Sequence, residues 1–198
     1  MKKLFALCGM LSAAVFLLAL ILFGALTPGY SHLSNAVSEL GMQKSSFPML
    51  FNLTGFLLPG ILAVLFSAGF YINTRPHIGS LLVTVLTGIS GLGFALLGVF
   101  PAANNFGSSV ETQLHFTMVT VNYLPFLMLT FLYPFRVRHP HWTRLKFFAL
   151  ATGVIAISSF FIPPSLLPAG ISQRLGLGIY FVWLFVMGLS LYKQPNGH

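Results

Sequence analysis

The stretch LFALCGMLSAAVFLLALILFGAL, residues 4–26, decides the fold of this protein. It contains no charged residue, and an α-helix needs about 20 apolar residues to cross the ~30 Å hydrocarbon core of a membrane. The apolar region of a secretory signal peptide is shorter, about 7–15 residues. The length therefore favours an uncleaved first membrane span over a signal peptide.

The same length criterion predicts six membrane spans along the chain. They cover roughly residues 4–26, 48–72, 80–100, 112–135, 147–162 and 173–192. The fifth is the shortest because Pro163 follows it. Pro59 and Pro125 fall inside the second and fourth spans, where they predict kinks that neighbouring helices tolerate in a membrane. The connecting segments are short, so we expect residues 1–198 to form one all-α domain, an integral membrane bundle of six transmembrane helices.

The composition supports the membrane class and excludes others. Hydrophobic residues make up 56% of the chain and charged residues only 6%, whereas soluble domains carry about 25% charged residues. The net charge of +8 comes from ten Lys and Arg against two Asp and Glu, so the protein is basic because acids are scarce. With a mean hydropathy of +0.88, this pattern indicates membrane lipids as partners and no nucleic acid.

The lysines and arginines divide unevenly between the two sets of connecting segments. The larger set is Lys2, Lys3, Arg75, Arg136, Arg138, Arg144, Lys146 and Lys193, and the smaller set is Lys44 and Arg174. Cytoplasmic loops carry an excess of Lys and Arg, so we expect both termini in the cytoplasm. The same orientation puts both acids, Glu39 and Glu111, at the non-cytoplasmic end of the bundle.

The first outer loop, residues 27–41, predicts a short amphipathic helix that Ser31 or Ser34 would cap and Gly41 would end. Its apolar face would be Leu33, Val37 and Leu40. Asn35 and Glu39 are four residues apart and would share a face of this helix, with His32 one turn earlier.

The second outer loop leads into the fourth span. Ser108 or Ser109 is placed to cap that helix, and Glu111 lies in its first turn, where an acid suits the helix dipole. His115 follows four residues later on the same helix face. The third outer loop ends at Gln173 and Arg174. The polar residues expected at this end of the bundle are Glu39, His115, Glu111, Arg174, His32, Ser38 and Gln173.

Several of these residues occur in a recognisable order. They are Tyr30-Ser31, Ser38-Glu39-Leu40-Gly41, Gly98-Val99-Phe100-Pro101, His115, Gly170, Gln173-Arg174 and Trp183. In this order the chain resembles the prokaryotic membrane family catalogued as domain of unknown function 998, over nearly its whole length. The resemblance implies a multi-pass protein of a prokaryotic cytoplasmic membrane with no established activity. The chain differs after Phe100-Pro101, where the family often has an acid and Ala102 and Ala103 stand here.

An ion-pair cluster is the favoured interpretation of the polar residues. An unpaired charge near the membrane boundary is costly, so Arg174 needs a partner. Glu39 and Glu111 are the only acids, and a pair with either would be joined by His115 and Gln173.

Two chemical alternatives use the same residues. Glu111 and His115, with His32 and Glu39, could supply oxygen and nitrogen ligands to a zinc ion. A hydrolase would use Ser38, Ser31 or Ser34 as nucleophile, a histidine as base, and a glutamate to orient that histidine. No motif for a cofactor is present, and we expect none.

Three classes of function follow. The favoured class is a structural membrane protein, or one that binds a lipid or small molecule at this polar cluster. The alternative is a membrane-embedded hydrolase or metalloenzyme that acts on lipid. A transporter or channel would need a polar path across the bundle, and the mid-span polar residues Asn52, Thr54 and Asn122 are sparse for one.

Overall fold

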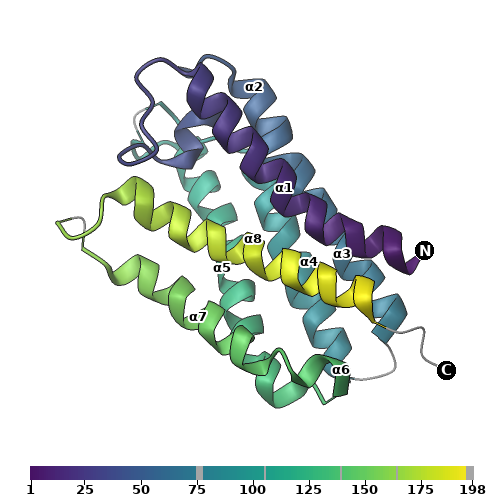
Figure 1. The fold of residues 1–198 in the computed structure, drawn as a ribbon. Coiled ribbons are helices and arrows are strands. Elements are labelled where there is room, and N and C mark those ends of the chain that lie inside the picture. Colours follow the sequence, from purple (N-terminus) through teal and green to yellow (C-terminus); the bar gives the residue numbers. More distant parts are fainter. Residues whose placement is uncertain (75–77, 105, 139, 164, 195–198) are drawn as a thin grey trace.

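The computed structural model describes residues 1–74, 78–104, 106–138, 140–163 and 165–194, and within these ranges the chain is helical and has no strand (Figure 1). The elements are α1 (Lys2–Leu26), the 3₁₀ helix η1 (Val37–Gly41), α2 (Pro48–Phe51), the π-helix η2 (Asn52–Leu57), α3 (Leu58–Thr74), α4 (Ile78–Leu97), α5 (Val110–Arg136), α6 (Pro140–Thr143), α7 (Lys146–Phe161) and α8 (Ala169–Lys193).

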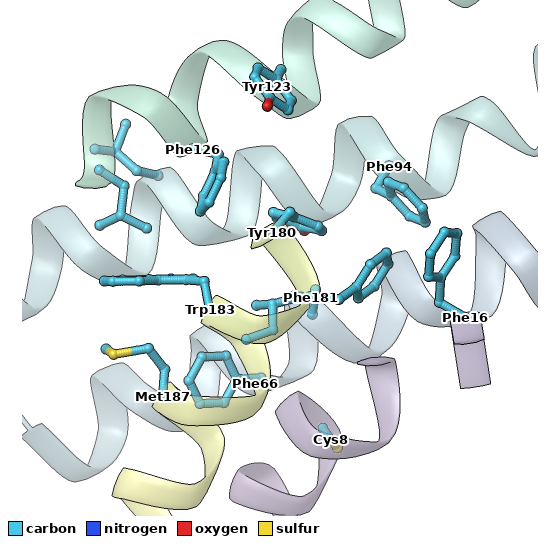
Figure 2. Close-up of a cluster of buried hydrophobic side chains, with 14 of the residues drawn as sticks. Cys8, Phe16, Phe66, Phe94, Tyr123, Phe126, Tyr180, Phe181, Trp183 and Met187 are labelled. Atoms are coloured by element: carbon cyan, nitrogen blue, oxygen red, sulfur yellow. The ribbon is translucent and has the colours of Figure 1, made fainter. Parts of the chain in front are cut away.

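The six longest helices pack as a closed ring in the order α1, α3, α4, α5, α7 and α8, with α8 returning to α1. Aromatic side chains fill its interior. Phe16 of α1 stacks on Phe181 of α8, and Figure 2 shows Phe126 of α5 turned toward Tyr180 of α8, with 5.2 Å between ring centroids. Burial of such large apolar side chains, together with close packing, holds the ring together.

Among the described residues, five helical segments are long and apolar enough to cross a membrane, which supports an all-helical protein of the membrane class. They are Lys2–Leu26, Pro48–Thr74, Gly79–Leu97, Val110–Arg136 and Gly170–Lys193. α7 has 16 residues, about 24 Å at 1.5 Å per residue, and is shorter than the hydrocarbon core. It ends at Phe161, two residues before Pro163. Five of the six predicted spans are therefore long and apolar enough to cross a membrane, and the predicted span at residues 147–162 is not confirmed.

Pro59 is accommodated by a change of helix type. A proline has no N–H and its ring crowds the carbonyl one turn earlier. Directly before it the backbone widens into the π-helix Asn52–Leu57, and the second span continues to Thr74. Ser12 of α1 donates to the Pro59 carbonyl at 2.8 Å, which ties this irregular stretch to the first helix.

The charged residues separate to the two ends of the ring. At the basic end, Lys2 donates to the Gln194 carbonyl, Lys3 lies over the Tyr192 ring, and Arg144 reaches Ser190 at 3.3 Å. The start of α1 and the end of α8 thus lie side by side (Figure 1). Arg75, counted above with the basic set, lies outside the described residues. We call the opposite end, which carries Glu39 and Glu111, the glutamate end.

The first loop differs from the predicted amphipathic helix. Instead of an α-helix capped by Ser31 or Ser34, it has a five-residue 3₁₀ helix, Val37–Gly41. Two backbone N–H groups of this loop donate to side chains instead of to helical carbonyls. Asn35 Oδ1 accepts from the Ser31 N–H at 2.9 Å, and Glu39 Oε1 accepts from the Ala36 N–H at 2.7 Å. The predicted proximity of Asn35 and Glu39 is confirmed, since Asn35 Nδ2 donates to Glu39 Oε2 at 3.0 Å.

Candidate functional site

The first turns of α8 hold the first loop in place. Gln173 Oε1 accepts from the Val37 N–H at 2.6 Å. Arg174 Nη1 donates to the Asn35 carbonyl at 2.8 Å and to the Gly170 carbonyl at 2.7 Å, and its Nη2 donates to the Tyr30 hydroxyl. We call Gln173 and Arg174 the loop clamp. It joins segments that lie more than a hundred residues apart in the chain.

The predicted direct pairing of Arg174 with a glutamate is wrong. Among the described residues the one ion pair within 4.0 Å is Lys44 Nζ with Glu39 Oε2 at 3.9 Å. The two carboxylate oxygens of Glu39 accept hydrogen bonds from the Ala36 N–H and from Asn35 Nδ2, as described above. The guanidinium of Arg174 instead donates to the carbonyl oxygens of Asn35 and Gly170, which also accept charge-assisted hydrogen bonds. Asn35, bonded to both, is the link between the two charges.

His32 packs against Tyr30, whose hydroxyl accepts from Arg174 of the loop clamp. Its ring lies edge-to-face with Tyr30 at 5.3 Å and covers Gly24, where a Cβ atom would lie 2.5 Å from the ring. Desolvation, and then the nearby charge of Arg174, lower the pKa of His32 below its ordinary value. His32 is therefore disfavoured from taking a proton while the loop is docked.

Glu111 and His115 lie in different surroundings although they share a helix. Ser109 caps α5 as predicted, accepting from the Thr112 N–H at 3.2 Å. Glu111 is exposed, beside a surface cavity of about 370 Å³ that Pro101 and Asn104 also line. His115 is 3% exposed, and its Nδ1 bonds to the Phe100 carbonyl at 2.8 Å.

This arrangement argues against both chemical alternatives. No three His, Cys, Asp or Glu side chains come together as a metal site within the described part of the chain. The Nδ1 partner of His115 is a carbonyl rather than a glutamate, so the orienting acid of a Ser–His–Glu hydrolase is missing from its expected place. Ser38 is buried at the cavity described next and bonds to neither histidine in the described structure.

A cavity of about 540 Å³ lies at the glutamate end between α5, α7, α8 and η1; we call it the main pocket. The lining side chains are mostly apolar, among them Phe56, Leu97, Val119 and Leu177. Of the predicted polar residues, His115, Ser38 and Gln173 line it, whereas Glu39, Glu111, Arg174 and His32 are not among its lining residues.

The main pocket exists because small residues replace aromatic ones. Toward the basic end, α8 carries Trp183, which points into the interior of the ring (Figure 2). It packs against Tyr133 of α5, with 5.4 Å between the ring centroids. One and two turns before Tyr180, α8 has Gly176 and Ser172. A Cβ atom on Gly176 would lie 2.8 Å from the Tyr123 hydroxyl, so glycine leaves room there.

Sequence reasoning missed the pocket residues Ser172, Gly176 and Ser159, and interpreted Asn122 only as a mid-span polar residue. Asn122 is held by Ser90 of α4, whose hydroxyl donates to the Asn122 carbonyl at 2.7 Å while Asn122 Nδ2 donates to the Ser90 carbonyl at 2.9 Å. The small residues Ser172 and Gly176, four apart on α8, were the available signal.

Glycines of the loop motifs make close backbone contacts with Asn52 at the start of the π-helix. A Cβ atom on Gly41 would lie 2.1 Å from Asn52 Oδ1, and one on Gly98 would lie 2.5 Å from the Asn52 carbonyl oxygen. Asn52 Nδ2 donates to the Gly41 carbonyl at 2.9 Å. These contacts hold the end of the first loop and the end of α4 against the second span.

The long apolar helices indicate an integral membrane helical bundle. The model of the family described as Protein of unknown function (DUF998) matches residues 10–190. The chain belongs to this family. No curated protein and no solved structure matches it.

Proposed function

We propose that the protein spans the cytoplasmic membrane of a prokaryote six times and binds the apolar chain of a lipid, or a similar small molecule, in the main pocket. The observation that carries this proposal is the position of the pocket rim. Phe116 of α5 and Phe160 of α7 line the pocket and are 51% and 61% exposed on the outside of the bundle. A chain from the surrounding lipid therefore has a short way in.

The size and lining of the pocket support the same proposal. Ligand pockets commonly measure about 300–1,000 Å³ and have apolar walls with a few polar groups. The main pocket has about 540 Å³, mostly apolar walls, and a few polar groups, among them those of Ser38, His115 and Gln173.

The proposed orientation places the basic end in the cytoplasm, because Lys2, Lys3, Arg144 and Lys193 gather there. α7 then forms the sixth pass, and the membrane thins locally or flanking residues adjust to its length. The pocket lies at the non-cytoplasmic end. A reporter active only outside the cytoplasm should be silent when fused after Ile72 and active when fused after Phe100. The opposite pattern contradicts the orientation.

Photolabelling tests the binding proposal. The probe is hexadecanol with a mid-chain diazirine, added to the full-length protein in lipid nanodiscs. Val119→Trp fills the pocket from α5, while Leu124→Trp adds the same side chain on the exposed, lipid-facing side of the same helix. We expect labelled pocket peptides in the unmodified protein and in Leu124→Trp, and a loss of at least fivefold in Val119→Trp. Equal labelling of Val119→Trp and the unmodified protein refutes the proposal.

A further inference from the structure

The main pocket has a polar side that carries no charge. Among the described residues that line it, none has a carboxylate, ammonium or guanidinium group. Arg174, the nearest cation on α8, directs both of its terminal nitrogens to the first loop and to Gly170 instead. A charged head group would therefore lose its water without gaining a counter-ion, which is costly. The pocket is built for an uncharged ligand.

His115 determines what kind of hydrogen bond the ligand makes. The Phe100 carbonyl can only accept, so Nδ1 of His115 carries a proton and donates it. The other nitrogen of a neutral imidazole, Nε2, is then an acceptor. His115 is 3% exposed, and burial disfavours the charged ring. In the described structure Nε2 has no hydrogen-bond partner, so it is left to accept from a ligand.

Ser172 supplies the complementary group. Its hydroxyl is buried, lines the same pocket, and lacks a hydrogen-bond partner among the described residues. Two other hydroxyls of the wall, those of Tyr123 and Ser159, are committed, since both donate to the Ala156 carbonyl. A buried polar group without a partner costs about 1–3 kcal/mol. A ligand that can bond to Ser172 removes that cost.

We infer that the main pocket selects uncharged lipids whose polar end is a hydroxyl group, such as long-chain alcohols and diacylglycerols. A hydroxyl donates to Nε2 of His115 and can accept from Ser172, whereas an ether, ester or quinone oxygen only accepts and leaves Nε2 unpaired. This inference rests on the proposed binding function and specifies its ligand.

Competition for the photoreactive hexadecanol tests the inference. The competitors share one chain: 1-hexadecanol, its methyl ether 1-methoxyhexadecane, and hexadecanoate at pH 8. We expect the alcohol to displace the probe at about tenfold lower concentration than either of the others, the effect of one satisfied buried hydrogen bond. Equal potency of alcohol and ether overturns the inference while Val119→Trp still abolishes labelling, so the binding proposal would survive. Labelling that is unchanged in Val119→Trp refutes both the binding proposal and this inference.

Two variants assign the preference to named atoms. His115→Asn keeps a side-chain N–H for the Phe100 carbonyl but has no nitrogen in place of Nε2. Alcohol and ether should therefore become about equally potent in this variant. Ser172→Ala removes a hydroxyl that bonds to no described residue, which leaves the fold intact, and should lower the alcohol's potency about threefold. An unchanged tenfold preference in His115→Asn overturns the inference.

Discussion

Replacing Arg174 with glutamine should release the first loop from α8. The variant removes two hydrogen bonds that cross to the loop, from Nη1 to the Asn35 carbonyl at 2.8 Å and from Nη2 to the Tyr30 hydroxyl. Hydrogen bonds to charged groups contribute about 1.5–3 kcal/mol each. Bonds made by one residue are not additive, so we take about 3 kcal/mol for the pair. That free energy corresponds to a roughly 150-fold weaker docking equilibrium.

Amide hydrogen exchange of the protein in nanodiscs measures this effect. The reporting amides are those of Asn35 and Val37, which bond to Ser31 and Gln173 in the docked loop. We expect Arg174→Gln to accelerate their exchange by about two orders of magnitude. Arg174→Lys should have an intermediate effect, because one ammonium cannot span both acceptors.

The matched control is Arg138→Gln, which removes one exposed positive charge at the basic end. It should leave exchange in the first loop unchanged. An acceleration below threefold in Arg174→Gln would refute the loop clamp. So would an equal acceleration in Arg138→Gln, since the effect would then follow net charge rather than the bonds described.

Two further predictions concern the same end of the bundle. The pKa of His32, followed by NMR, should lie below 6.5. The undocked loop then binds more protons than the docked loop, so docking should weaken as the pH falls through 6.5. Arg174→Gln should raise the pKa of His32. A His32 pKa at its ordinary value in the unmodified protein would contradict the packing described. Gly41→Ala and Gly98→Ala should each lower the free energy of unfolding by about 1–3 kcal/mol through overpacking. Asn52→Ala should rescue Gly41→Ala, which meets the Asn52 side chain, but not Gly98→Ala, which meets its backbone; equal rescue of both would be evidence against these contacts.

Local spacing predicted local contacts correctly. The cap of α5 at Ser109 and the contact between Asn35 and Glu39 join residues three or four apart, where the backbone conformation alone sets the distance. The partner of Arg174 was predicted wrongly, because Asn35 lies 139 residues away. Charge complementarity suggested a glutamate, and the packing of the loop on α8 presented carbonyl oxygens instead.

By itself, the sequence determined the class of the protein. Apolar runs of membrane-spanning length and the scarcity of charge lead to a helical membrane bundle wherever the helices sit in the ring. The tertiary structure alone decided where the polar groups meet and where space remains. A cavity is the difference between the volume that six helices enclose and the volume that their side chains fill. Gly176 and Ser172 line one because α8 packs with these small residues beside Tyr123 of α5 and Ser159 of α7.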